Sequence, residues 1–320
     1  MECVVGCGIE FAECMKIEKR DFYGWENTVL LSNGQAEVLV TTDVGPRVIS
    51  YEVGGRGNIF KVIEAEAGGR GEAEFQLRGG HRLWLAPESE VLSYHADNGP
   101  VEWRHDKERG EVVFESLQSH PVPIRKVLGV SLAEGSSRVT IRHCAINEGQ
   151  EAVELATWGL TAMRSGGIEL IPQPVLGEHP RDLLPNRRFV FWPYTDLADS
   201  RIHFGTSFLL LRQEAEMPPL KFGLDHREGW VAYLSGDLLF LKAIESVPGA
   251  IYPDMGCNFE TFTNGDFLEI ESLGVLRRLE PGESVTHHES WYLFPVEEEV
   301  TLESEEALID WISPYIGMMR

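Results

Sequence analysis

The sequence predicts an all-β protein built mainly from antiparallel strands, which form a sandwich of two large sheets. Short runs rich in Val, Ile, Leu and aromatic residues recur along the chain, and Gly, Asn, Asp or Pro separates them. The 32 glycines and 17 prolines suit a protein with many turns. Since no repeat, low-complexity tract or linker divides the chain, we expect residues 1–320 to form one domain.

The expected strands follow one another in order, and turn residues bound them. Asn33–Gly34 lies between two apolar runs and is typical of a hairpin. The run at 138–146 alternates, with Val139, Ile141 and His143 on one side. The segment 267–294 predicts two strands joined by a turn. The other expected strands are 28–31, 36–42, 48–53, 111–117, 126–132 and 151–158.

One short helix is expected near the C-terminus. Ser304 can cap it, and the two glutamates that follow favour its positive end. Leu308, Ile309 and Ile312 form an apolar stripe at helical spacing. Pro314 should limit the helix. The residues after Glu10 allow a second short helix.

Charge and cysteine content limit the classes of partner. The net charge is -23 and the isoelectric point about 4.8, which disfavours nucleic acid, anionic membranes and polyanionic substrates. The five cysteines form no Cys-x-x-Cys spacing and read as reduced thiols of a cytoplasmic protein. They are Cys3, Cys7, Cys14, Cys144 and Cys257. The N-terminus lacks a signal-peptide pattern, and the apolar runs are too short to span a bilayer.

The most informative segment is the expected strand at 267–273. Its alternation places Phe267, Glu269 and Glu271 on one face, and Leu268 and Ile270 on the other. Two carboxylates among strong strand formers indicate either a functional site or a strand that faces solvent. We expect a central strand whose two glutamates point into a concave face.

A second cluster lies far upstream, at 79–88, and reads as a loop. It brings together His81, Arg82, Trp84 and Glu88. A carboxylate strand and a loop with basic and aromatic residues are the groups that a sugar site needs. We therefore expect His81, Arg82 and Glu269 to converge within about a sugar's width.

Three segments near the C-terminus carry a resemblance. They are 265–271 (Gly-Asp-Phe-Leu-Glu-Ile-Glu), 279–283 (Leu-Glu-Pro-Gly-Glu) and 291–294 (Trp-Tyr-Leu-Phe). Together they resemble the ending of the aldose 1-epimerases (galactose mutarotases). Gly79–Gly80 resembles the family's early double glycine, and 44–50 resembles its first strands. The motifs at 79–84 and 192–197 resemble an uncharacterised branch of the galactose mutarotase-like superfamily.

The resemblance implies a galactose mutarotase-like β-supersandwich that binds carbohydrate. It matches Glu269 to the family's catalytic base and places Glu271 where the family has glutamine. The family's acid histidine falls at Trp158, and an indole N–H is a hydrogen-bond donor but not an acid. Either His81 supplies the missing acid from another segment, or the mutarotase reaction is lost.

The candidate residues are of two kinds. Those expected to act in catalysis are Glu269 as base, with His81 and Arg82 as its partners. Those expected to bind substrate offer hydroxyl-binding groups, aromatic faces or a polar rim: Arg47, Trp84, Glu88, Trp158, Tyr194, Asp196, Asn258, Glu260 and Glu271. Core packing and turn formation are the alternatives for the aromatic and rim residues.

No cofactor or metal site is expected from the sequence. It has no phosphate-binding glycine loop and no nucleophile elbow, and His287 and His288 face opposite ways on a strand. The first functional hypothesis is an aldose 1-epimerase-like enzyme that acts on a small carbohydrate. The alternatives are a non-catalytic sugar-binding or sensing protein and an accessory lyase or glycosidase. Oligomeric state does not follow from the sequence.

Overall fold

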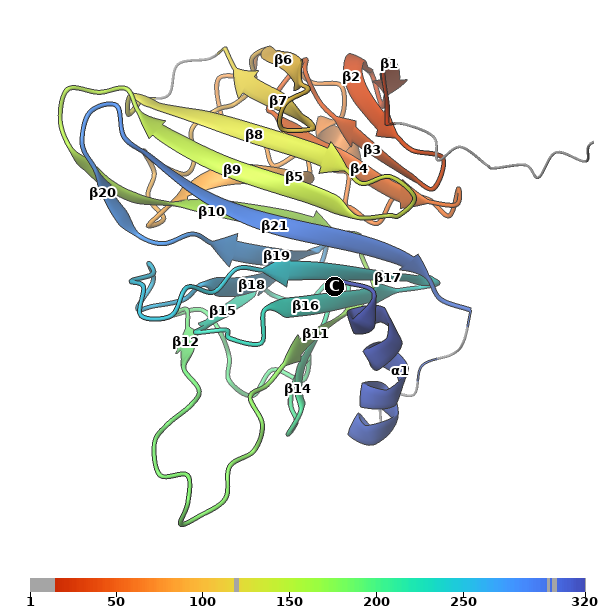
Figure 1. The fold of residues 1–320 in the computed structure, drawn as a ribbon, viewed down its shortest axis with the longest axis vertical. Coiled ribbons are helices and arrows are strands. Elements are labelled where there is room, and N and C mark those ends of the chain that lie inside the picture. Colours follow the sequence, from red (N-terminus) through yellow and green to blue (C-terminus); the bar gives the residue numbers. More distant parts are fainter. Residues whose placement is uncertain (1–14, 118–120, 298–299, 301–303, 320) are drawn as a thin grey trace, which may run out of the picture.

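The computed structural model describes residues 15–117, 121–297, 300 and 304–319, and it is a sandwich of two antiparallel β-sheets (Figure 1). Cys3, Cys7, Cys14 and the helix expected after Glu10 lie outside the described residues. The two antiparallel sheets confirm the all-β sandwich expected from the sequence.

In the described part of the chain, the first sheet has eleven strands and the second has ten. The first runs in the order β1 (Lys16–Phe22), β2 (Trp25–Ser32), β3 (Ala36–Val40), β4 (Arg47–Val53), β5 (Gly80–Ala86), β10 (Val153–Met163), β19 (Leu268–Leu273), β18 (Phe259–Thr263), β15 (Leu220–Leu224) and β12 (Phe189–Phe191), with β20 (Arg277–Leu279) paired to β10. The second runs β13 (Ile202–Phe204), β14 (Phe208–Arg212), β11 (Ile168–Pro172), β16 (Trp230–Ser235), β17 (Leu238–Ile244), β21 (Ser284–Pro295), β9 (Val139–Asn147), β8 (Ile124–Leu132), β7 (Glu111–Ser116) and β6 (Val101–Asp106).

The hairpin expected at Asn33–Gly34 joins β2 to β3. Gly34 has a φ of 83°, which a side chain would disfavour. The Asn33 carboxamide oxygen accepts from the backbone N–H groups of Gln35 and Ala36. Its amide nitrogen donates to the carbonyl of Ala133 at 2.6 Å. The turn is thus anchored to the loop between β8 and β9.

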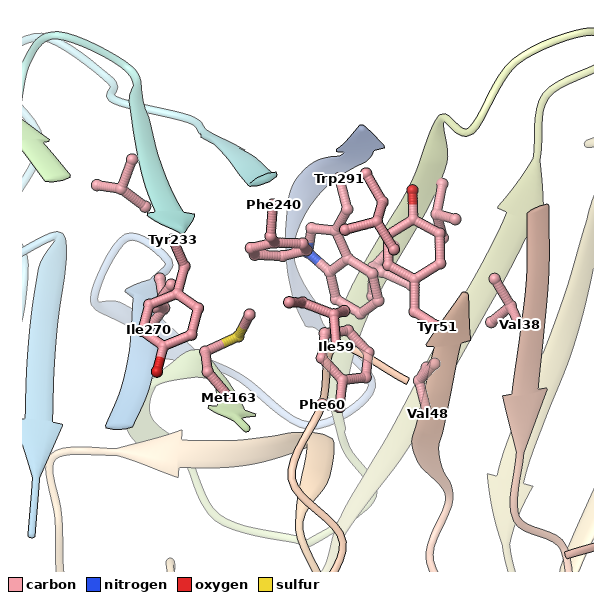
Figure 2. Close-up of a cluster of buried hydrophobic side chains, with 14 of the residues drawn as sticks. Val38, Val48, Tyr51, Ile59, Phe60, Met163, Tyr233, Phe240, Ile270 and Trp291 are labelled. Atoms are coloured by element: carbon pink, nitrogen blue, oxygen red, sulfur yellow. The ribbon is translucent and has the colours of Figure 1, made fainter. Parts of the chain in front are cut away.

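The space between the sheets is filled by aromatic and aliphatic side chains (Figure 2). Phe60 lies 5.4 Å from Trp291 and 5.9 Å from Phe240, measured between ring centroids. Leu268 and Ile270 of β19 are buried in the same core. The alternation of β19 therefore directs its aliphatic residues between the sheets and its glutamates to the outer face.

The segment 79–88, expected to be a loop, is for most of its length the buried strand β5, which lies between β4 and β10. The prediction was wrong because Gly79 and Gly80 are residues typical of loops. A Cβ at Gly80 would lie 2.4 Å from the carbonyl oxygen of Val48. Glycine is thus needed here for the close approach of β4, and it begins a strand.

The helix α1 (Glu305–Gly317) packs beside the second sheet (Figure 1). The Ser304 side chain caps it by accepting from the N–H of Ala307. Leu308 and Ile312 are buried, but the third stripe residue, Ile309, is 40% exposed.

The expected limit at Pro314 is wrong, because the helix continues to Gly317. Pro314 removes one backbone donor near the end of α1, where few further helical bonds depend on it. Beside it, the Ser313 hydroxyl donates to the carbonyl of Ile309 at 2.6 Å. A 3₁₀ helix at Glu64–Glu66 precedes β5. Across the described residues, no helix combines the length and apolarity that crossing a membrane requires.

Candidate functional site

A pocket of about 290 Å³ lies on the outer face of the first sheet, opposite the face that packs on the second sheet. Strands β5, β10, β19, β15 and β18 form its floor. Its lining residues are Phe75, Leu77, Arg82, Trp84, Glu88, Tyr94, Trp158, Leu160, Tyr194, Lys221, Phe262, Asn264, Phe267, Glu269 and Glu271. This volume is at the lower end of the range for ligand pockets and suits a small ligand.

Arg82 and Glu269 form an ion pair in the pocket. They come from β5 and β19, which flank β10 on either side, and Arg82 Nη1 donates to Glu269 Oε1 at 2.7 Å. Both side chains are buried. The guanidinium of Arg82 also lies 4.3 Å from the ring centroid of Trp84, so a cation–π contact holds it in place. The base expected on β19 therefore has an arginine partner.

Lys221 of β15 lies between two buried carboxyl groups. Its Nζ is 2.9 Å from Glu260 Oε2 and 2.9 Å from Glu271 Oε2. It also lies 4.5 Å from the ring centroid of Trp158 and 4.8 Å from that of Trp192. Burial would lower the pKa of Lys221, but the two carboxylates outweigh burial and raise it. Lys221 therefore remains an ammonium group.

The two oxygens of Glu271 have different surroundings. Oε2 accepts from the indole N–H of Trp158 at 3.0 Å and from Lys221. Oε1 is buried and has no hydrogen-bond partner among the described residues. Burial raises the pKa of Glu271, and Lys221 offsets that effect only in part. Because donors already occupy Oε2, Oε1 is the atom that can carry a proton.

Aromatic side chains form the walls. The Trp84 ring lies 5.6 Å from Trp158 and 5.0 Å from Tyr94, both edge to face. At the mouth, the Tyr94 hydroxyl donates to Glu88 at 2.5 Å. Tyr194 is 51% exposed there, and partial burial raises its pKa to about 12. Apolar aromatic faces beside a few placed polar groups are the usual lining of a small-molecule pocket.

Seven of the residues selected from the sequence line this pocket. They are Arg82, Trp84, Glu88, Trp158, Tyr194, Glu269 and Glu271. The strand prediction explains why Glu269 and Glu271 are both in the pocket, because the alternation of β19 directs both glutamates to one face. The role of each residue stays a prediction.

The other five candidates, His81 among them, do not line the pocket. Arg47 is fully buried, pairs with Asp97 at 3.0 Å, and donates to the carbonyls of Gln76 and Leu77, so it holds the loop that carries Phe75. The exposed Asp196 accepts from the N–H of Ala198 within a turn.

Asn258 and Glu260 are buried and do not line the pocket. The buried carboxamide of Asn258 bonds the N–H and carbonyl of His226 at 2.6 and 2.7 Å, which is a structural contact. Glu260 is buried beside the pocket, on the same face of β18 as the lining residue Phe262, and pairs with Lys221. Burial raises the pKa of Glu260 well above its usual range.

His81 does not converge with Arg82 and Glu269, contrary to expectation. Adjacent strand residues face opposite ways, and β5 directs Arg82 into the pocket and His81 between the sheets. His81 is fully buried there, with Nδ1 2.9 Å from Thr161 Oγ1 and Nε2 2.7 Å from His143 Nε2. Burial lowers the pKa of His81 to about 3.

The groups around His81 form what we call the inter-sheet cluster: His81, His143, Lys242, His287 and Glu289. Lys242 Nζ is 2.8 Å from Glu289 Oε1, and both side chains are fully buried. Burial alone would raise the pKa of Glu289, but Lys242 outweighs it and holds the pKa well below its usual range.

Ligand atoms of His81, His143 and Glu289 lie within 4.8 Å of one another, a grouping able to hold a metal ion. The Lys242 ammonium already supplies the positive charge that Glu289 needs. A hydrogen-bonded network therefore accounts for the cluster.

Sequence reasoning missed Lys221 and Tyr94. A signal for Lys221 was present, since it is the one charged residue in the apolar strand Leu220–Leu224. A lysine in such a strand needs a buried partner. Tyr94 lies in a loop, and nothing in the local pattern linked it to Glu88.

By sequence, the chain matches no protein-family model and no curated protein. By structure, it is similar to a galactose mutarotase-like protein from Lactobacillus casei, with a TM-score of 0.57 and 12% identity over 84% of this chain and 100% of that one. A galactose mutarotase-like protein from Clostridium acetobutylicum gives 0.51 and 11% identity over 88% and 99% of the two chains.

A TPR-domain containing protein from Parabacteroides distasonis also matches, with a TM-score of 0.57 and 13% identity. The match covers 86% of this chain and 49% of that one, so this chain spans about half of that protein's length. The likenesses show that the fold is a galactose mutarotase-like β-sandwich. Identities this low establish the fold and not the reaction.

Proposed function

We propose that the outer pocket binds a monosaccharide and that the protein interconverts sugar anomers, with Glu269 as base and Glu271 as acid. The observation that carries this proposal is the presence of both carboxyl groups, two positions apart on β19, in one small aromatic-walled pocket. Supporting it, the fold is that of galactose mutarotase-like proteins.

The reaction needs two proton transfers, at the two oxygens bonded to the anomeric carbon. A base removes the proton of the anomeric hydroxyl and an acid protonates the ring oxygen, so the bond between that oxygen and the anomeric carbon breaks and the open-chain aldehyde forms. Rotation of the aldehyde and the reverse proton transfers close the ring as the other anomer. Alternate residues of a strand are about 7 Å apart, so two carboxyl groups at that spacing suit two oxygens of one anomeric centre.

The two carboxyl groups have different surroundings, which suits different roles. Glu269 accepts a hydrogen bond from the Arg82 guanidinium, which orients it for the role of base. Burial raises the pKa of Glu271, which favours its protonated form, and its Oε1 has no hydrogen-bond partner among the described residues. A protonated carboxyl group can donate a proton. Glu271 thus supplies the acid that the family places at Trp158, and Trp158 fixes the opposite oxygen of Glu271.

We further infer that the ligand is a neutral sugar. Arg82 and Lys221 are the cationic side chains among the residues that line the pocket, and each is within 2.9 Å of a carboxylate. Glu88 adds another acidic group at the mouth. A phosphate or carboxylate on the sugar would meet this negative charge without an unpaired cation, so glucose 6-phosphate and glucuronate should bind more weakly than glucose.

Saturation-exchange NMR on glucose and galactose tests the reaction. Glu269→Gln and Glu271→Gln should each lower the enzyme-dependent exchange rate by about 10²–10⁴, the usual effect of a general base or acid. Glu90→Gln is the matched control and should keep the full rate, because Glu90 is exposed and does not line the pocket.

A second function is favoured by one observation, the indole at the position of the family's acid histidine. In that case the pocket binds sugar without catalysis. Wild-type protein that binds an aldose in calorimetry but never exceeds the spontaneous exchange rate would support this alternative and contradict the enzymatic proposal.

A further inference from the structure

Three neighbouring strands of the first sheet bring Lys221, Glu260 and Glu271 together (Figure 1). Glu271 of β19 lies directly opposite Glu260 of β18 in the strand register. Lys221 of the next strand, β15, reaches both glutamates, with Nζ 2.9 Å from one carboxyl oxygen of each. We call these three residues the lysine triad.

The lysine triad is almost entirely buried. Each of its three side chains is at most 5% exposed. Trp158 and Trp192 cover the ammonium group, with ring centroids 4.5 and 4.8 Å from Nζ of Lys221. Because little water reaches these charges to screen their repulsion, they need to be balanced locally.

The sheet leaves room for the side chain of Glu260. Gly223 of β15 pairs with Glu260 in the strand register. A Cβ at Gly223 would lie 3.0 Å from Glu260 Cγ and 2.7 Å from the sulfur of Cys257. Glycine weakens the interior of a strand, so it is found there mainly where another group approaches closely. The position of the Glu260 carboxyl group is therefore built into the sheet.

Charge balance allows the triad one negative charge. The neighbouring cations are already paired, Arg82 with Glu269 at 2.7 Å and Lys242 with Glu289 at 2.8 Å. Within the described chain, Lys221 is thus the cation at ion-pair distance from the two carboxyl groups of the triad. Two carboxylates directly opposite each other repel, and one ammonium group neutralises only one of them.

The other titratable side chains around the triad are acids, so they do not supply the missing positive charge. They are Glu88, Tyr94, Glu169, Tyr194, Asp254 and Cys257. Burial raises the pKa of Glu169 to about 8, which makes it neutral at pH 7. Asp254 is partly buried, and its charge opposes the ionisation of Glu260. One carboxyl group of the triad therefore keeps a proton near neutral pH.

We propose that Glu260 and Glu271 hold a single proton between them, balanced by Lys221, and that Glu260 is a positioning residue that keeps this proton available to Glu271. The inference rests on the proposed function of the pocket, in which Glu271 is the acid. When Glu271 gives its proton to the ring oxygen of the sugar, Lys221 stabilises the carboxylate that forms. Ring closure returns a proton from that oxygen to Glu271, so the triad ends each turnover as it began.

Replacement of Glu260 tests the sharing of the proton. In Glu260→Gln, Lys221 faces only one carboxyl group, so the pKa of Glu271 should fall by about one unit or more. Glu271 can act as an acid only while it is protonated. As pH rises, the anomer exchange rate of this variant should therefore be lost at a lower pH than in wild type, by the same shift. Lys221→Met removes the cation and should raise the pKa of Glu271.

Glu111→Gln is the matched control. Glu111 is also buried, but it pairs with Arg142 at 2.7 Å on the second sheet and does not line the pocket. This variant should leave both the pKa of Glu271 and the pH dependence of the exchange rate unchanged.

NMR of protein with ¹³C-labelled glutamate carboxyl groups measures the pKa of Glu271 without depending on activity. The signal of Glu271 is the one that disappears in Glu271→Gln. In the wild type this signal should titrate in two steps, because the proton is shared between two coupled groups. That measurement remains decisive if Glu260→Gln does not fold. Saturation-exchange NMR over the same pH range gives the rate.

An unchanged pKa of Glu271 in Glu260→Gln would overturn the inference, because Glu260 would then be neutral already and glutamine would merely replace it. A single-step titration of Glu271 in the wild type would overturn it as well. The expected shift in a protein that never exceeds the spontaneous exchange rate would support the shared proton and contradict the enzymatic proposal, so the two failures are distinguishable.

Discussion

Two polar clusters lie on opposite faces of the first sheet, and adjacent residues of β5 contribute to each. Arg82 belongs to the pocket cluster, which we define as Arg82, Lys221, Glu269 and Glu271. His81 belongs to the inter-sheet cluster. Both clusters contain buried charges, but all four residues of the pocket cluster line one pocket, whereas His287 of the inter-sheet cluster lines a different one, beside β20 and β21. The difference teaches that convergence of charged side chains on one pocket, and not the presence of ionisable residues, separates a candidate site from a structural network.

The inter-sheet cluster largely satisfies its own hydrogen bonds. Lys242 Nζ contacts Glu289, Thr161 Oγ1 and the carbonyl of Ile270. Glu289 Oε2 accepts from the indole N–H of Trp291 at 2.7 Å. Both clusters leave buried atoms without a hydrogen-bond partner within the described chain: His143 Nδ1 in the inter-sheet cluster, and Arg82 Nε and Glu271 Oε1 in the pocket cluster. The latter two belong to side chains that line the outer pocket, where a ligand would meet them.

The largest expected effect on stability comes from breaking the inter-sheet ion pair. Lys242→Met should leave Glu289 charged and unpaired in the core, and should lower the free energy of unfolding by about 3–5 kcal/mol. Urea denaturation measures this. The matched control is Lys61→Met, whose partner Asp266 is largely exposed, with an expected cost of about 1 kcal/mol or less. Equal losses in the two variants would contradict the structural role.

A smaller effect should appear in the pH dependence of stability. Burial lowers the pKa of His81 to about 3 from an ordinary value of 6.5. Between these pH values the unfolded chain binds more protons than the folded protein. The contribution is therefore fully present above pH 6.5 and is lost as pH falls below it.

His81→Gln tests this effect, because glutamine is polar but does not titrate. Between pH 7 and pH 5, wild type should lose about 2 kcal/mol more unfolding free energy than this variant. Denaturation curves at the two pH values supply the comparison, and contributions from groups distant from the inter-sheet cluster cancel in the difference. Identical pH dependence in both proteins would show that His81 is not held neutral by the fold.

The smallest expected effect concerns the mouth of the pocket. Tyr194→Ala should weaken aldose binding about two- to tenfold, since an aromatic contact is worth about 0.5–1.5 kcal/mol, and should hardly change the unfolding temperature. Calorimetric titration measures the affinity. Tyr23→Ala is the control, because Tyr23 is similarly exposed, at 56%, but lies in the turn between β1 and β2. If both variants bind equally well, Tyr194 is not part of the site.

Period-two alternation made the main features predictable. The pattern in β19 was sufficient to place Glu269 and Glu271 on one face, and Asn33–Gly34 was sufficient to place a hairpin. The prediction for β5 was wrong for a related reason. Once 79–88 was read as a loop, alternation was not applied, and His81 and Arg82 were expected on the same side.

Other features depend on contacts that no local pattern encodes. Lys221 meets Glu271 only because β15, β18 and β19 are neighbours in the sheet. Asn258 could not be separated from a binding residue without knowing that its carboxamide bonds the His226 backbone. That residues 1–320 form one domain stays a prediction.

The most direct test of the central claim is a crystal structure of the protein soaked with glucose or galactose. The claim predicts a sugar ring in the outer pocket, with its anomeric centre beside Glu269 and Glu271 and a face of the ring against Trp84 or Tyr194. An empty pocket at a sugar concentration that saturates binding in calorimetry, or a sugar bound at another surface of the sandwich, would contradict it.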